Sequence, residues 1–84
     1  MEAVFHKSFK KKFKRLPPKI QAQFYTRLDL FLRDPFNAVL HNHSIDKAFP
    51  DCRSINITGD YRAIFQSQGE LAAFITIGTH AELY

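Results

Sequence analysis

The chain has 84 residues, 45% of them hydrophobic, with nine Phe, three Tyr and one cysteine, which predicts a single small domain over residues 1–84 and argues against global disorder. We expect no membrane span, because no apolar run is long enough, and no signal peptide, because no apolar run precedes the N-terminal charges. The lone Cys52 favours a reducing cytoplasm. The net charge of +4 divides into +7 for residues 1–33 and −3 for residues 34–84. That basic half indicates either a polyanionic partner, nucleic acid or an acidic protein, or only a solvated helix face.

The first third of the sequence predicts a strand and then a helical hairpin. Residues 3–6 are a strand candidate, and Phe9, Phe13 and Leu16 follow at helical spacing, with Ser8 as a candidate N-cap. Two prolines at positions 17 and 18 end this helix, and residues 19–34 carry a second apolar stripe up to an Asp-Pro pair. The first helix holds the basic cluster Lys10, Lys11, Lys12, Lys14 and Arg15.

The second half predicts a loop and three antiparallel strands. Residues 35–51 have no clear period, and we interpret them as a loop that covers another part of the molecule. Residues 53–58, 61–67 and 71–77 are strand candidates joined by short turns, and the last is apolar enough to be central and buried on both faces. The order of elements predicts a two-layer α+β fold, in which the strand and helical hairpin pack on an antiparallel sheet of about four strands. The face without helices would be open to the loop and the C-terminal tail.

Chemically versatile side chains lie around the most apolar segment. Asp60 and Arg62 stand at the start of one strand candidate, and His80 and Tyr84 follow the next; His43 could join them from the loop. In RNA cleavage by internal attack, a base takes the 2′-OH proton, a cation stabilises the phosphate and an acid protonates the 5′-oxygen, and His and Arg supply these functions without a metal. Each residue also has a structural interpretation: a turn residue, an ion-paired arginine, a surface histidine or a packed ring.

A metal site is a weaker interpretation of the same residues. His41, His43, Cys52 and His80 offer four nitrogen or sulfur ligands, but one His-x-His and two isolated residues lack the two close pairs of structural zinc sites. No signature around Cys52 indicates a nucleophile. We therefore expect neither a metal nor another cofactor.

Three segments, LHNHSI (40–45), CRSINITGDYRAIF (52–65) and IGTHAELY (77–84), resemble the RelE/ParE superfamily of type II toxins, in particular its YafQ-like (RelE/StbE) mRNA interferase branch. The resemblance covers nearly the whole chain. It implies a RelE-like fold and a ribosome-dependent endoribonuclease, which cuts mRNA in the decoding site and is inhibited by a cognate antitoxin.

The resemblance also implies roles for individual residues. Arg62 corresponds to the arginine that contacts the scissile phosphate, and His80 to the C-terminal general acid or base. Asn56 stands where the branch often has a second histidine, so either His43 or Asp60 would be the base, with His80 as the acid. Tyr84 corresponds to a terminal aromatic residue that stacks on a base or orients the RNA.

Further residues are candidates for binding ribosomal RNA. The basic cluster of the first helix would contact phosphates without sequence preference. Arg53 would face RNA, or would pair with Asp51 or Asp34. Two other functions stay open: a ParE-like toxin that inhibits DNA gyrase by binding alone, and a nucleic-acid-binding module without activity. Two histidines and a strand arginine favour the nuclease, whose partners would be the antitoxin, the ribosome and mRNA, with no membrane.

Overall fold

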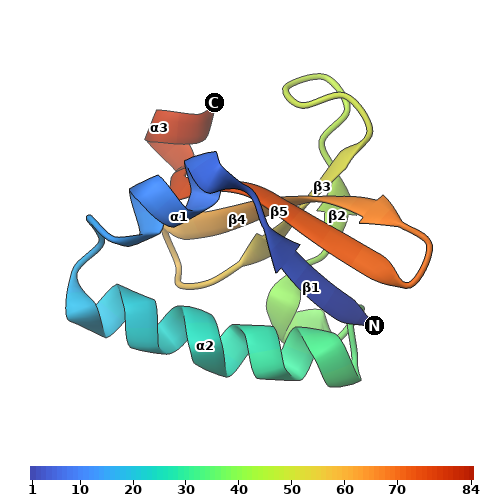
Figure 1. The fold of residues 1–84 in the computed structure, drawn as a ribbon, viewed down its shortest axis with the longest axis horizontal. Helices are drawn as coiled ribbons and strands as arrows, with labels where there is room; N and C mark the ends of the chain where they lie inside the picture. Colours follow the sequence, from blue (N-terminus) through green and yellow to red (C-terminus); the bar gives the residue numbers. More distant parts are fainter.

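A five-stranded sheet forms the centre of the computed structural model, which describes residues 1–84 (Figure 1). The strands lie in the order β1-β5-β4-β3-β2; β1 is parallel to β5, and all other neighbours are antiparallel. In chain order the elements are β1 (Glu2–Phe5), α1 (Lys7–Phe13), α2 (Pro18–Arg33), the 3-10 turn η1 (Ala38–Leu40), β2 (His43–Ser44), β3 (Cys52–Asn56), β4 (Tyr61–Gln68), β5 (Leu71–Thr79) and α3 (His80–Leu83). This arrangement confirms the predicted α+β architecture, in which a strand and two helices precede a mainly antiparallel sheet.

The structure adds elements that the sequence pattern did not predict. The segment interpreted as a loop contains η1 and the two-residue strand β2, so the sheet has five strands where about four were expected. The C-terminal tail forms the short helix α3. β5 is an interior strand, as predicted, but β4 occupies the centre of the sheet.

The ends of α1 and α2 show which local sequence signals set the helix boundaries. α2 begins at Pro18, because proline suits the first helical turn, and it ends before the Asp-Pro pair at positions 34 and 35. The prediction of Ser8 as the N-cap of α1 is wrong: His6 is the N-cap residue, and the Ser8 hydroxyl donates to the Ile75 carbonyl at 2.9 Å. Ser8 therefore connects α1 to β5.

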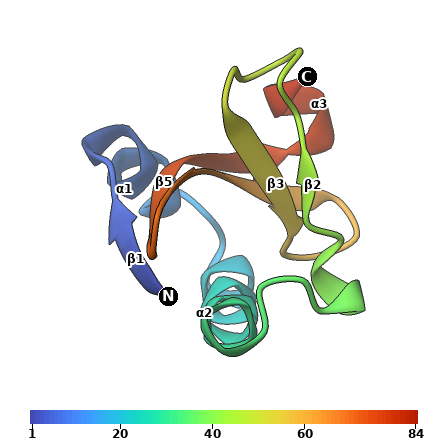
Figure 2. The same cartoon turned by 90° about the vertical axis from the view of Figure 1, so that its right-hand side faces the viewer.

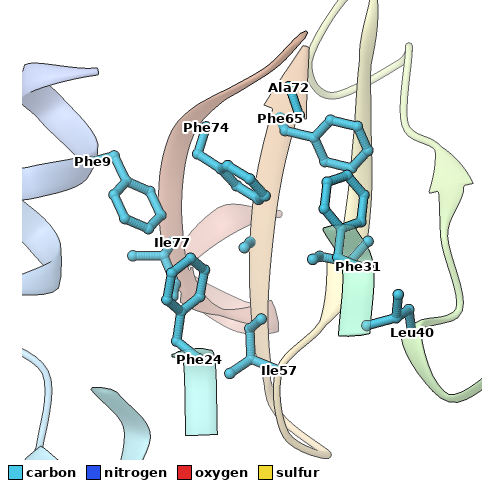
Figure 3. Close-up of a cluster of buried hydrophobic side chains, with 11 residues drawn as sticks. Phe9, Phe24, Phe31, Leu40, Ile57, Phe65, Ala72, Phe74 and Ile77 are labelled. Atoms are coloured by element: carbon cyan, nitrogen blue, oxygen red, sulfur yellow. The ribbon is translucent and has the colours of Figure 1, made fainter. Parts of the chain in front are cut away.

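An aromatic core fills the space between the sheet and the two longer helices (Figure 3). Phe74 of β5 lies at its centre, fully buried, with its ring centroid 5.4–5.9 Å from those of Phe5, Phe9, Phe24, Phe31 and Phe65. These rings come from β1, α1, α2 and β4, so both long helices pack against one face of the sheet, as predicted.

The opposite face is covered more thinly. Figure 2 shows α3 on the side of the sheet away from α2. A small cluster of Cys52, Ile64 and Leu83 packs there, with Ile45, Phe49 and Ile75 at its margin. The tail and the segment after β2 therefore reach this face, as the sequence indicated. None of the helices combines the length and apolar character that a membrane span would need.

Replacing the central ring should cost far more stability than replacing an exposed one. We predict that Phe74→Ala lowers the free energy of unfolding by about 3–5 kcal/mol, because it leaves a cavity among five other rings. Phe36→Ala is the matched control, because Phe36 is 68% exposed. This substitution should lower the free energy of unfolding by less than about 1 kcal/mol. Urea denaturation followed by circular dichroism measures both, and similar losses in the two variants would contradict the assignment of Phe74 as the centre of the core.

Candidate functional site

Strand register places His43 and Arg62 on the thinly covered face. His43 of β2 lies opposite Ser54 of β3, and Ser54 lies opposite Ile64 of β4. Side chains directly opposite each other share a face, and those two positions apart along a strand do so as well. Arg62, two residues before Ile64, therefore points to the same side as His43.

The C-terminal helix folds back over the neighbouring strand end at Gly78, which pairs with Arg62. A Cβ atom at Gly78 would lie only 3.2 Å from Glu82 Oε1, so the residue's lack of a side chain makes room for α3. Thr79 and Glu82 form a capping box, in which the Thr79 N–H donates to Glu82 Oε1 at 2.7 Å and the Glu82 N–H donates to Thr79 Oγ1. These contacts hold the start of α3, and with it His80, beside the sheet.

A cleft of about 310 Å³ opens where these segments meet. Its lining residues come from η1's C-terminal side, β2, β4 and α3, and they are His41, His43, Ile45, Arg62, His80 and Tyr84. The structure thus brings together all the predicted catalytic residues except Asp60. We call this the histidine cleft.

Arg62 contributes a positive charge without an acidic partner. Its Nη1 lies 3.1–3.2 Å from the carbonyl oxygens of Thr58, Gly59 and Tyr61, and these are the only hydrogen bonds of the guanidinium. The chain's two ion pairs join the N-terminus to Glu70 and Arg33 to Asp29, so the interpretation of Arg62 as an ion-paired residue is wrong. Its charge is held in place and available to an anion.

His43 is oriented by a backbone carbonyl. Its Nδ1 lies 2.8 Å from the carbonyl oxygen of His41, which can only accept, so a neutral His43 carries its proton on Nδ1 and leaves Nε2 unprotonated. His41 adopts a left-handed conformation with φ of 47°, and its ring centroid lies 4.7 Å from that of His43. His41 is not among the predicted catalytic residues, and only the His-x-His spacing of the sequence indicates its place beside His43 in the cleft.

His80 and Tyr84 line the cleft from α3 and the C-terminal residue. They are one helical turn apart, and their ring centroids are separated by 4.8 Å. The ring of Tyr84 is 46% exposed and lines the cleft, which does not fit the interpretation of Tyr84 as a packed C-terminal plug. Both side chains are accessible to a ligand.

Asp60 lies outside the histidine cleft. Its carboxylate does not line the histidine cleft; its backbone carbonyl accepts from the His80 N–H at 3.0 Å, and its own N–H donates to Thr58 Oγ1 at 3.2 Å. The turn thereby positions α3. A catalytic role for Asp60 stays a prediction without a geometric contact to the cleft.

Asn56 lies in the register position opposite Arg62. Its Oδ1 is buried without a hydrogen-bond partner, as is Ser54 Oγ on the same face. An amide oxygen cannot take up a proton near neutral pH, so Asn56 leaves proton transfer to the histidines.

Arg53 supports the segment that carries the histidines. Its Nε donates to Asn42 Oδ1 at 2.7 Å, and its guanidinium lies 5.4 Å from the centre of the Phe36 ring. The alternative of an ion pair with Asp51 or Asp34 is wrong. Contact of Arg53 with RNA stays a prediction.

The basic cluster has no acidic partner within ion-pair distance, and two of its members, Lys14 and Arg15, follow the end of α1 at Phe13, so the first helix ends before the prolines that were predicted to end it. Lys12 and Arg15 line a hollow together with Glu82 of α3, so the basic helix lies next to the helix that carries His80. The pKa of Glu82 is lowered, first by the Thr79 N–H, then by the Thr79 side chain, and further by the charge of Lys12.

Cys52 and the histidines show no sign of a metal centre. Burial raises the pKa of the Cys52 thiol, and the nearby Asp51 and Asp46 raise it further, which keeps the sulfur protonated. No group of three or more His, Cys, Asp and Glu side chains is arranged to hold a metal ion.

Known proteins resemble this chain in sequence pattern and in fold. The family described as the ParE toxin of the type II toxin-antitoxin system, parDE, matches residues 3–84. The crystal structure of YafQ from E. coli strain BL21(DE3) has a TM-score of 0.81 at 20% identity, over 98% of this chain and 96% of that one. Comparison with curated protein sequences gave no match.

Two further structures share the fold. The YoeB/ParE toxin from Agrobacterium tumefaciens has a TM-score of 0.75 at 16% identity, over 95% of this chain and 99% of that one. The RelB-RelE antitoxin-toxin complex from Methanococcus jannaschii has a TM-score of 0.76 at 21% identity, over 96% and 94%. At such identities, the likeness shows a common fold.

The capping box should make the position of α3 depend on pH. The folded-state pKa of Glu82 lies below its ordinary value of 4.5, so the ionised carboxylate stabilises α3 above that value, and this contribution is lost as the pH falls through the folded-state pKa. We predict that the Glu82 carboxyl titrates below 4.5, and that the amide signals of His80 and Tyr84 shift with it. NMR from about pH 6 to about pH 2 measures both, with Glu82→Gln as the control that lacks the transition. A Glu82 midpoint at or above 4.5 would contradict the prediction.

Proposed function

The chain belongs to the ParE toxin family of type II toxin–antitoxin systems, and on that premise we propose that it is a ribosome-dependent endoribonuclease that cleaves mRNA. The observation that supports this activity is the histidine cleft, in which the imidazoles of three histidines line the same space as a guanidinium without an acidic partner. A single-stranded RNA phosphate is an anion that such a guanidinium binds well.

In the proposed reaction, His43 Nε2 takes the proton of the ribose 2′-OH, since the contact with the His41 carbonyl leaves that nitrogen unprotonated. The 2′-oxygen then attacks phosphorus, while Arg62 stabilises the added negative charge. Protonated His80 gives its proton to the departing 5′-oxygen, the bond from phosphorus to that oxygen breaks, and a 2′,3′-cyclic phosphate is left. Tyr84 provides a ring on which a base can stack.

The alternative is a ParE-like inhibitor of DNA gyrase that acts by binding, and it is favoured by the family whose description matches this chain. Binding alone requires no oriented imidazole and no second histidine in the same cleft as an arginine. The arrangement of His43, Arg62 and His80 therefore supports the nuclease over the inhibitor.

The remaining surfaces suit the proposed partners. The basic cluster, beside α3, would bind ribosomal RNA phosphates. Solved complexes of the same fold contain an antitoxin, as in the RelB-RelE complex, and we propose a cognate antitoxin for this chain, in the cytoplasm where mRNA is translated. It would neutralise the basic cluster and cover the aromatic hollow between α1 and α2, where Lys10 and Lys14 flank Phe13 and Tyr25.

Removing the proposed acid should abolish mRNA cleavage. We predict that induced wild type cuts a reporter mRNA at in-frame positions seen by primer extension, and that His80→Ala lowers cutting by about 100-fold or more. His6→Ala is the matched control, because His6 is an exposed residue before α1, outside the cleft, and should cut like the wild type.

Other outcomes separate the two functions. Growth arrest with intact mRNA and a DNA damage response would support the gyrase inhibitor. Equal cutting by wild type and His80→Ala would remove His80 from the chemistry.

Reversing charge beside the aromatic hollow should weaken antitoxin binding. The measurement uses a His80→Ala background to avoid toxicity, and the protein encoded in the adjacent reading frame as the antitoxin. We predict that Lys10→Glu combined with Lys14→Glu raises the Kd for this antitoxin roughly tenfold or more at low salt. The control carries the same charge change at Lys7 and Lys19, which do not line the hollow. Calorimetry measures both, and equal weakening would assign the effect to overall charge.

A further inference from the structure

A second hollow, of about 400 Å³, continues from the histidine cleft. It is lined by Ser44, Ile45, Asp46, Lys47, Ala48 and Tyr84. Ile45 and Tyr84 line both spaces, so the hollow begins where the wall of the proposed phosphate site ends. We call it the side hollow.

We propose that the side hollow binds a nucleobase adjacent to the scissile phosphate, and that Asp46 selects which base is accepted. This inference rests on the proposed nuclease function. An RNA strand with its phosphate at Arg62 must place a neighbouring base within one nucleotide of the cleft, and the side hollow is the space that shares its wall.

The walls match the two parts of a base. Ile45, Ala48 and the ring of Tyr84 offer apolar and aromatic surface for the face of a base, on which stacking does not depend on base identity. The edge of the base must then meet the polar side chains at the rim. Sequence selectivity in single-stranded RNA arises from hydrogen bonds to that edge.

Asp46 is held in position for such a contact. The Asp51 N–H donates to Asp46 Oδ1 at 3.0 Å, which fixes the carboxylate, while Oδ2 has no hydrogen-bond partner in the chain. No lysine or arginine lies within ion-pair distance of Asp46. Asp46, which lines both the side hollow and a neighbouring hollow with Asp51 and Arg53, therefore has one held carboxylate oxygen and one that is free to accept a hydrogen bond.

An ionised carboxylate only accepts hydrogen bonds, so it favours bases with amino groups. Adenine, cytosine and guanine each carry an exocyclic amino group. Uracil has no amino group, and its single N–H lies between two carbonyl oxygens that the carboxylate repels. Asp46 should therefore disfavour uracil at one position beside the cut.

Asp46→Asn tests this by reversing the hydrogen-bond character of the free atom. The amide oxygen still accepts from the Asp51 N–H, whereas an NH2 group replaces the free oxygen and donates to a carbonyl. On a reporter mRNA with randomised codons, we expect wild-type cuts to be depleted in uracil at one flanking position. In Asp46→Asn, the ratio of uracil to the other bases there should rise roughly fivefold to a hundredfold.

Asp51→Asn is the matched control. It makes the same change from carboxylate to amide at a residue that does not line the side hollow. Asparagine tolerates the left-handed φ of 62° at position 51. This variant should keep the wild-type base frequencies. Identical base frequencies in wild type and Asp46→Asn, with cutting in both, would overturn the inference alone.

Two outcomes concern the premise and the variant. If the wild type makes no cuts, the nuclease function and this inference both fall. If Asp46→Asn cuts too weakly to map, the test is made by binding. Purified protein is titrated with short RNAs that differ in one base and carry a 2′-deoxy group at the attack position, and fluorescence anisotropy measures their affinities. Loss of the wild-type discrimination against uracil supports the inference, and unchanged discrimination overturns it.

Discussion

The alternation of side chains along β4 is the constraint on which both the core and the histidine cleft depend. Ala63 and Phe65 are buried against the aromatic core, while Arg62 and Ile64 point to the face that carries α3. A slip of one residue would exchange the two sets and bury the Arg62 charge among phenylalanine rings, which costs several kcal/mol. Packing of the aromatic core therefore selects the register that builds the cleft, and the stability of one face fixes the chemistry of the other.

The uneven cover of the two faces follows from the short chain. Two helices and six Phe rings fill one side, whereas the other is covered by α3 and by the segment after β2. That side tolerates polar groups that a core would not, namely Arg62 without an acid and the unpartnered atoms Ser54 Oγ and Asn56 Oδ1. Buried atoms without a partner, such as Ser54 Oγ and Asn56 Oδ1, lower the stability of the fold, whereas the Arg62 guanidinium is held by three backbone carbonyls.

Features set by a local pattern could be predicted from the sequence, and features set by contacts between distant segments could not. The apolar stripe and prolines of α2 and the alternation of the meander strands lie within short windows, so their elements were predictable. β2 has only two residues and exists because Ser54 and Arg53 offer a partner strand. α3 depends on the space above Gly78, and the place of Ser8 depends on the Ile75 carbonyl. For the site, the resemblance gave the residues that line the cleft, but His41 and the separation of Asp60 required the fold.

The geometry of the histidine cleft bears on whether the chain acts by chemistry or by binding. A protein that only binds a partner gains affinity from exposed charges and apolar contacts, and the protonation pattern of one histidine adds nothing to either. Here the left-handed backbone at His41 turns its carbonyl toward His43, which assigns the proton to Nδ1 and frees Nε2. His41 is the C-cap residue of η1, where a left-handed backbone is common, and histidine is among the residues other than glycine that adopt it most often. In the neutral form of His43, an oriented Nε2 without a proton shares the cleft with an arginine that has no acidic partner, and the proposed removal of a proton near a phosphate requires such a nitrogen. The carbonyl of His41, at the C-cap of η1, is therefore the group that orients His43 for the proposed proton transfer.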